Sequence, residues 1–120
     1  MPLPDVYSIV QLVVGTVLSG LGAYLCLRWY TFWKGNFKGR LLTSGPYARV
    51  RHPFYSGFLI LVVGLAVLIP SFETLTLPVI SFPVIFYYVK REEDWLVSKY
   101  GRAYLQYMER VPWRLFPGVY

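Results

Sequence analysis

The sequence predicts an all-α integral membrane protein with three transmembrane helices and a C-terminal cytoplasmic interfacial helix, within one domain spanning residues 1–120. Two observations favour this class. Hydrophobic residues make up 56% of the 120 residues and charged residues only 15%, whereas an average soluble domain is about 25% charged. All 12 Lys and Arg residues lie in two segments, 28–51 and 90–114, next to long apolar stretches, as expected for membrane helices.

The first predicted transmembrane helix covers residues 6–30. Its only charged residue is Arg28, near its end. A helix of about 22 residues is long enough to cross the hydrocarbon core of a bilayer. A stripe of small residues consists of Gly15, Ser19, Gly20, Gly22 and Ala23. Gly15, Ser19 and Ala23 follow one another at intervals of four, which permits close packing of helices. We interpret this stripe as a helix contact within the fold rather than as a dimer motif.

The second and third predicted transmembrane helices, residues 55–69 and 72–89, form a hairpin because only Pro70 and Ser71 separate them. Each is near the lower length limit for a span. Pro78 and Pro83 are expected to kink the third helix and free backbone carbonyls. The kinks either widen a lipid-facing pocket or are tolerated packing features.

Residues 90–117 are polar but patterned. We expect them to lie against the cytoplasmic surface and to fold back over the mouth of the hairpin. Gly101 interrupts the helix or caps its first half. Large side chains recur at helical spacing, namely Leu96, Tyr100, Tyr104 and Tyr107. We interpret the tyrosines as interfacial packing rather than as cofactor contacts.

The distribution of basic residues predicts the orientation. A hairpin brings both basic segments to one side, and only Asp5 and Glu73 are acidic on the other. The positive-inside rule therefore places the N-terminus outside, and the loop 31–54 and the C-terminus in the cytoplasm. The membrane is a prokaryotic plasma membrane or the endoplasmic reticulum. The net charge of +6 suits anionic lipid headgroups, and no nucleic-acid partner is expected.

Two polar clusters flank the hairpin. Residues 49–57 read Arg-Val-Arg-His-Pro-Phe-Tyr-Ser-Gly, and residues 91–94 read Arg-Glu-Glu-Asp. Because they stand at the open ends of the hairpin, we expect them to meet on the cytoplasmic side.

These clusters and their neighbours resemble the isoprenylcysteine carboxyl methyltransferase and phospholipid methyltransferase superfamily, whose members are membrane-embedded enzymes that use S-adenosylmethionine (SAM). The similar segments lie between residues 40 and 117, and are 42–47, 50–57, 92–93, 100–104 and 111–112. The resemblance implies a SAM site at the two clusters, with the methyl group aimed at a lipid-accessible tunnel.

The resemblance also implies site residues. The expected cofactor-binding residues are Tyr47, His52, Pro53, Tyr55, Gly57, Glu92 and Glu93. The expected catalytic residues are Arg51, His52 and Glu93. We expect no metal site, because one His and one Cys cannot assemble one.

The acceptor stays open. A carboxylate acceptor needs only a cation to orient it, for which Arg51, Arg91 and Arg114 are candidates. An amine acceptor needs a proton acceptor such as His52 or a glutamate. The expected function is transfer of a methyl group from SAM to a lipid-like or lipid-attached acceptor, either an isoprenylcysteine-type carboxylate or a phospholipid amine.

The alternative is a non-catalytic membrane partner or assembly protein that retains the fold. Three predicted spans, where members of the superfamily usually have four or more, motivate it. For the same reason we keep open a homo-oligomer in which a second copy completes the pocket. The expected partners are membrane lipids and a lipophilic methyl acceptor.

Overall fold

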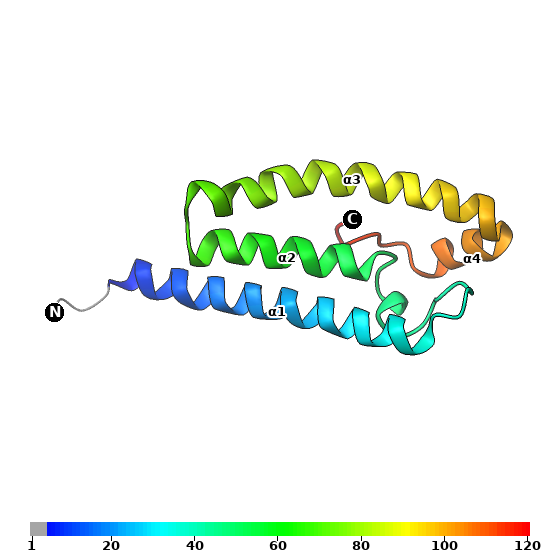
Figure 1. The fold of residues 1–120 in the computed structure, drawn as a ribbon, viewed down its shortest axis with the longest axis horizontal. Helices are drawn as coiled ribbons and strands as arrows, with labels where there is room; N and C mark the ends of the chain where they lie inside the picture. Colours follow the sequence, from blue (N-terminus) through cyan, green and yellow to red (C-terminus); the bar gives the residue numbers. More distant parts are fainter. Residues whose placement is uncertain (1–4) are drawn as a thin grey trace.

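The computed structural model describes residues 5–120, and these residues are helical or irregular without any strand. The helices are α1 (Val6–Asn36), the 3-10 helix η1 (Gly45–Ala48), α2 (Pro53–Leu68), α3 (Phe72–Tyr100) and α4 (Arg102–Arg110). The three long helices lie side by side, with α2 between α1 and α3 (Figure 1). The predicted all-α class is confirmed. Within residues 5–120, α1 and α3 are long and apolar enough to cross a membrane, and α2 is a shorter apolar helix of 16 residues.

Helices α1 and α2 are in direct backbone contact. A Cβ atom added to Gly22 would lie 2.4 Å from the backbone nitrogen of Leu61. One added to Gly64 would lie 2.3 Å from the backbone nitrogen of Ser19. Small residues permit such an approach between apolar helices. Gly15 and Gly22 of the small-residue stripe therefore contact α2 as expected, whereas a Cβ atom on Gly20 would have nothing within 4 Å. Most large apolar side chains of α1 point outward and are exposed.

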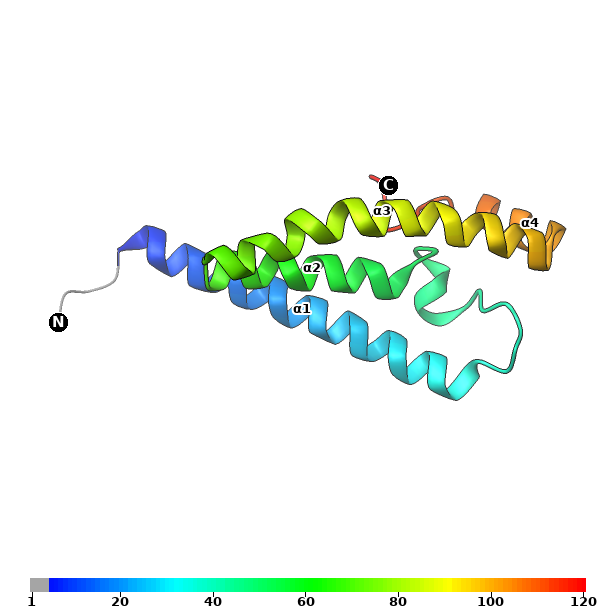
Figure 2. The same cartoon turned by 45° about the horizontal axis from the view of Figure 1, so that its top comes forward.

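Helix α3 runs on past the expected end at Val89 to Tyr100. Residues 90–100 contain no Pro or Gly and are mostly good helix formers, so nothing breaks the helix before Gly101. Gly101 has φ of 58°, a conformation that favours glycine. Pro78 and Pro83 lie inside the helix without ending it, and α3 bends gently along its length (Figure 2).

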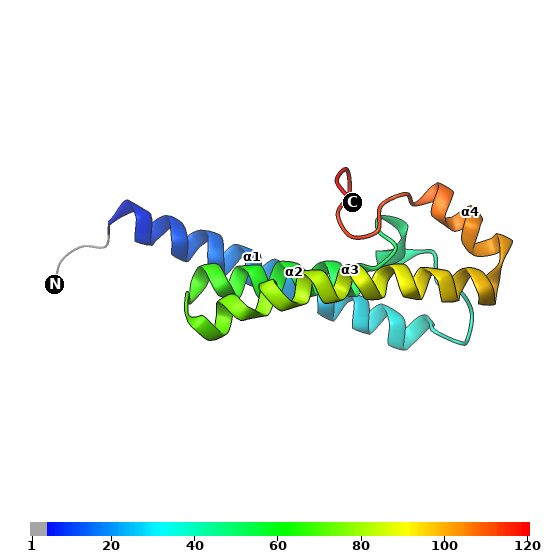
Figure 3. The ribbon, with the colours of Figure 1, turned by 90° about the horizontal axis from the view of Figure 1, so that it is seen from above.

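The chain reverses at Gly101, and α4 and the C-terminal segment lie on one side of the layer of long helices (Figure 3). The C-terminal segment then pairs with the turn before α2. The amides of Arg51 and His52 donate to the carbonyls of Trp113 and Arg114, each at 2.9 Å. A turn and a segment about sixty residues apart in sequence are thus joined through their backbones.

Candidate active site

A buried ion cluster centres on Glu93, which is only 3% exposed. The Nε atom of Arg51 lies 2.8 Å from Glu93 Oε2, and the Nε2 atom of His52 lies 2.9 Å from the same oxygen. Arg114 Nε donates to Glu93 Oε1 at 2.9 Å. Because a buried charge without partners is very costly, this cluster holds the turn at 51–52, helix α3 and the C-terminal segment in one arrangement.

Arg114 keeps its charge in this cluster. Partial burial alone would lower its pKa, but hydrogen bonds with Glu93 and with Tyr120 outweigh burial and raise the pKa above its ordinary value. Arg114 therefore acts as a permanent cation that binds the C-terminal segment to α3.

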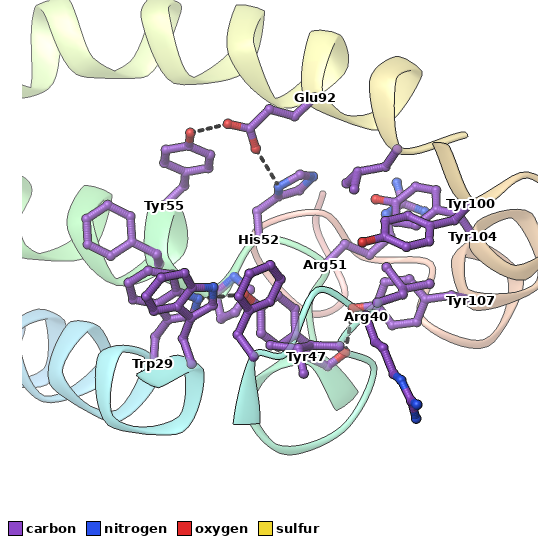
Figure 4. Close-up of a pocket in the computed structure, with 17 residues that line it drawn as sticks. Trp29, Arg40, Tyr47, Arg51, His52, Tyr55, Glu92, Tyr100, Tyr104 and Tyr107 are labelled. Atoms are coloured by element: carbon purple, nitrogen blue, oxygen red, sulfur yellow. Dashed lines mark hydrogen bonds and ion pairs between the residues drawn. The ribbon is translucent and has the colours of Figure 1, made fainter. Parts of the chain in front are cut away.

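His52 lies between the carboxylates of Glu92 and Glu93, and Figure 4 shows the contact with Glu92. Its Nε2 faces Glu93, and its Nδ1 lies 3.8 Å from an oxygen of Glu92. The Glu92 side chain is 44% exposed and accepts a hydrogen bond from the hydroxyl of Tyr55. Since an ionised carboxylate only accepts hydrogen bonds, the neutral tautomer that fits this contact has its proton on Nε2. The Nδ1 atom then carries a lone pair on the side of Glu92.

A cavity of about 330 Å³ opens beside His52. Its wall is mostly aromatic and comes from α1, η1, α2, α3 and α4 together (Figure 4). The aromatic residues in the wall are Trp29, Trp33, Phe37, Tyr47, Phe54, Tyr55, Tyr100, Tyr104 and Tyr107. Such a cavity, apolar with few polar groups, is typical of a small-molecule site.

Internal hydrogen bonds fix the floor of the cavity. Trp29 Nε1 donates to the hydroxyl of Tyr47 at 2.7 Å, and the hydroxyl of Tyr107 donates to the carbonyl of Tyr47 at 2.7 Å. Burial raises the pKa of Tyr47, of Tyr104 and of Tyr107 above the ordinary value, so these hydroxyls stay neutral. The wall therefore carries neutral tyrosine hydroxyls, of which that of Tyr107 is already used in an internal hydrogen bond.

Most of the predicted site residues come together at this cavity. The predicted residues in its wall are Tyr47, Arg51, His52, Pro53, Tyr55 and Glu92. The expectation that the two polar clusters meet is thus fulfilled in the geometry. Pro53 occupies the first position of α2, where a missing N–H leaves no helical hydrogen bond unmade.

The structure does not bring Gly57 and Glu93 to the cavity wall. A Cβ atom on Gly57 would lie 2.9 Å from the Cβ atom of Leu25, so its small size serves the contact with α1. Glu93 lies behind the wall, where Arg51, His52 and Arg114 occupy its oxygens. Arg91, the remaining candidate cation, instead donates to the hydroxyl of Tyr87 and lies away from the cavity.

The interpretation of three tyrosines as packing residues is incomplete. Tyr100, Tyr104 and Tyr107 also line the cavity. Tyr100 does so from the end of α3, and the other two because α4 turns back after Gly101. Trp29 was not singled out at all, since an aromatic residue near the end of a membrane helix normally indicates an interfacial belt. Only the crossing of α1 with η1 shows that Trp29 faces inward.

Comparisons with known proteins agree on a family. The sequence model of the phospholipid methyltransferase family matches residues 6–103. A protein-S-isoprenylcysteine O-methyltransferase of Schizosaccharomyces pombe is 39% identical over 80 residues, which cover 66% of this chain and 34% of the relative. The protein-S-isoprenylcysteine O-methyltransferase B of Arabidopsis thaliana is 38% identical over 78 residues, 61% of this chain and 38% of the relative.

A third relative has a different name. The Delta(14)-sterol reductase of Mus musculus is 38% identical over 87 residues, which cover 68% of this chain and 20% of that protein. The chain thus spans between about a fifth and two fifths of the length of these relatives. The family match spans most of the chain and includes both polar clusters. The chain belongs to the phospholipid methyltransferase family, within the superfamily that also holds the isoprenylcysteine methyltransferases.

Proposed function

We propose that this protein is a membrane methyltransferase that uses SAM and methylates a lipid-like or lipid-attached acceptor. The observation that carries the proposal is the position of His52, held by buried Glu93 on one side and facing Glu92 at the wall of an aromatic cavity. This arrangement lies at the polar end of long apolar helices. A soluble cofactor and a lipophilic acceptor would meet at such a boundary.

The proposal includes three membrane spans. Because α2 packs backbone to backbone on α1, we place α2 in the bilayer beside it, although it is short. The basic residues gather at the end of the molecule that holds η1 and α4. By the positive-inside rule this end is cytoplasmic, with α4 at the interface and the N-terminus outside. Within the single domain, the cavity and the C-terminal segment then face the cytoplasm, and the membrane is a prokaryotic plasma membrane or the endoplasmic reticulum.

The cavity suits SAM by chemical type. Glu92 is the accessible carboxylate in its wall, able to pair with an ammonium group or accept from ribose hydroxyls. The rings of Tyr47 and Tyr55 offer faces on which an adenine stacks or near which a sulfonium is stabilised. When bound, SAM supplies an electrophilic methyl group. We assign Gly57 no contact with it, because Gly57 faces α1.

In the proposed reaction, the side chains of the protein position the acceptor and remove water from its attacking group. The aromatic wall excludes water from an attacking group, which raises its reactivity. Arg51 lines the cavity as a cation for a ligand carboxylate, and the Nδ1 atom of His52 is available to take a proton from an acceptor amine. Glu93 acts as a positioning residue, because it holds Arg51 and His52 without reaching the cavity.

A reductase is the second candidate, since two relatives are named Delta(14)-sterol reductase. Reduction of a sterol needs a hydride donor, commonly a nicotinamide dinucleotide. A dinucleotide is much larger than SAM, and a cavity of about 330 Å³ is near the small end of the usual range. The size of the cavity therefore favours the mononucleoside donor.

The test is transfer of label from methyl-labelled SAM in membranes that contain the protein. An ester product releases volatile methanol in base, whereas an N-methyl product keeps its label, so one extraction separates the two acceptor classes. We expect label above that of control membranes, greatly reduced by His52→Ala and retained by Asp94→Asn, an exposed acidic neighbour outside this cavity. No label with folded protein would contradict the proposal and favour a non-catalytic partner.

A further inference from the structure

The hydroxyl of Tyr104 is buried without a hydrogen-bond partner among the described residues. Tyr104 is only 1% exposed, yet it forms part of the cavity wall. Figure 4 shows its side chain pointing from α4 toward the region of Arg51. Leaving a buried hydroxyl unpaired costs roughly 1–3 kcal/mol, so a group from outside the chain is the natural partner.

Tyr107 on the same helix is a buried tyrosine whose hydroxyl does have an internal hydrogen-bond partner. It is also 1% exposed and also lines the cavity, but its hydroxyl donates to the carbonyl of Tyr47 at 2.7 Å. The two residues therefore share their burial and their cavity but differ in whether the hydroxyl has an internal partner. This difference separates a structural hydroxyl from one that is free to bind a ligand.

The surroundings of Tyr104 determine what it would bind. Burial raises the pKa of Tyr104, so the hydroxyl keeps its proton, and the nearby charges of Glu93 and Arg51 also act on it. Arg51 uses its Nε and Nη2 edge for Glu93 and lines the cavity as well. A phenol and a guanidinium on one stretch of wall are two donors, and they suit an anionic acceptor such as a carboxylate.

Glu92 supplies a negatively charged hydrogen-bond acceptor in another part of the cavity wall. Its carboxylate is 44% exposed and faces Nδ1 of His52, whereas Glu93 faces Nε2 of the same ring. The cavity thus offers donors at Tyr104 and Arg51 and an acceptor at Glu92. A zwitterionic amino-acid group carries the matching pair of charges, a carboxylate and an ammonium.

We propose that Tyr104 and Arg51 form the subsite for the carboxylate of the amino-acid end of the methyl donor, with Glu92 facing its ammonium group. This inference rests on the proposed function, because it concerns the same donor. It assigns a ligand contact to a residue in α4, outside both polar clusters. It also gives a role to a hydroxyl that makes no internal hydrogen bond.

The test uses two probes that share an adenosine and a thioether. S-adenosylhomocysteine has the amino-acid group, and methylthioadenosine lacks it. Titration calorimetry on the full chain in detergent should show that the wild type binds the first more tightly. Tyr104→Phe should weaken the binding of S-adenosylhomocysteine by about tenfold or more, as expected for one hydrogen bond to a charged group. The affinity for methylthioadenosine should not change.

Tyr107→Phe is the matched control. It removes a hydroxyl of equal burial from the same helix, so we expect a lower unfolding temperature but the same ratio of the two affinities. The unfolding temperature of Tyr104→Phe should equal or exceed that of the wild type, because no internal hydrogen bond is lost.

The outcomes separate the inference from the proposed function. If the wild type binds neither probe, the proposed function fails and the subsite with it. If the wild type binds both probes equally, or if Tyr104→Phe weakens both equally or neither, the subsite is wrong while SAM binding stands. If Tyr104→Phe changes neither affinity, the result would also indicate that a trapped water is the partner of the hydroxyl.

Discussion

Two interfaces in this protein are stabilised by different kinds of interaction. The α1–α2 interface is fixed by shape, since Gly22 and Gly64 bring two helix backbones together where no side chain fits. The interface around Glu93 is fixed by charge, since one buried carboxylate contacts cations from the turn before α2 and from the C-terminal segment. The first sets how the apolar helices pack, and the second builds a cavity wall.

The comparison indicates where chemistry is located in the chain. A glycine contact between apolar helices carries no charge and can only support a scaffold. A charge cluster fixes the direction of each side chain in it, and His52 thereby presents one ring nitrogen to Glu93 and the other toward Glu92. Changes in the two interfaces should therefore differ in size and in kind.

The largest effect is expected from Glu93→Leu. The change leaves Arg51 buried without its carboxylate, and breaking a buried ion pair by removing one partner costs about 3–5 kcal/mol. We expect a large drop in the thermal unfolding midpoint in detergent. Glu92→Gln, at a partly exposed site, is the control and should lower the midpoint much less. Equal drops in the two variants would refute the division of roles between the glutamates.

Gly22→Leu tests the interface fixed by shape. The new side chain would overlap the backbone of Leu61, and overpacking of this kind costs about 1–3 kcal/mol or more. The unfolding midpoint should fall, while the folded fraction keeps its affinity for S-adenosylhomocysteine. Gly20→Leu is the matched control, because nothing lies within 4 Å of a Cβ atom there. A midpoint unchanged by Gly22→Leu would mean that α1 and α2 are not in backbone contact.

Alkaline pH should lower the stability of the fold around the ion cluster, because two tyrosines there are buried. Burial raises the pKa of Tyr104 and of Tyr107 above the ordinary value of 10.0. Above that pH the unfolded chain releases these protons and the folded chain keeps them, so stability falls as the pH rises, by about 1.4 kcal/mol per pH unit for each residue. Below it the contribution is constant. Unfolding midpoints measured from about pH 9 to about pH 11 should fall less steeply in a Tyr104→Phe variant.

Tyr107→Phe gives the smallest expected effect, a loss of about 1 kcal/mol. The variant removes the hydrogen bond to the carbonyl of Tyr47 and so loosens η1 against α4. Chemical denaturation in detergent measures the change. If Tyr104→Phe were equally destabilised, its hydroxyl would have an internal partner after all.

The sequence was sufficient to predict the helices and the meeting of the two polar clusters. Hydropathy located α1, α2 and α3, and hairpin geometry placed His52 near Glu92 and Glu93. The different roles of the glutamates were not predictable, because neighbouring residues on a helix point in different directions and only the register of α3 decides which one is buried. The cavity role of Tyr104 depends on the reversal at Gly101, and the role of Gly57 depends on how closely α1 approaches. Both are tertiary contacts that no local pattern encodes.

Binding of S-adenosylhomocysteine to the wild type and to Glu92→Gln tests the central claim most directly. The claim is that the cavity beside His52 binds the methyl donor in contact with Glu92. Calorimetry should detect binding to the wild type and a loss of about tenfold or more in Glu92→Gln, as for a contact with a charged group. Asp94→Asn, at an exposed site on the same helix outside this cavity, should bind as the wild type does. Equal affinity of the wild type and Glu92→Gln would contradict the claim.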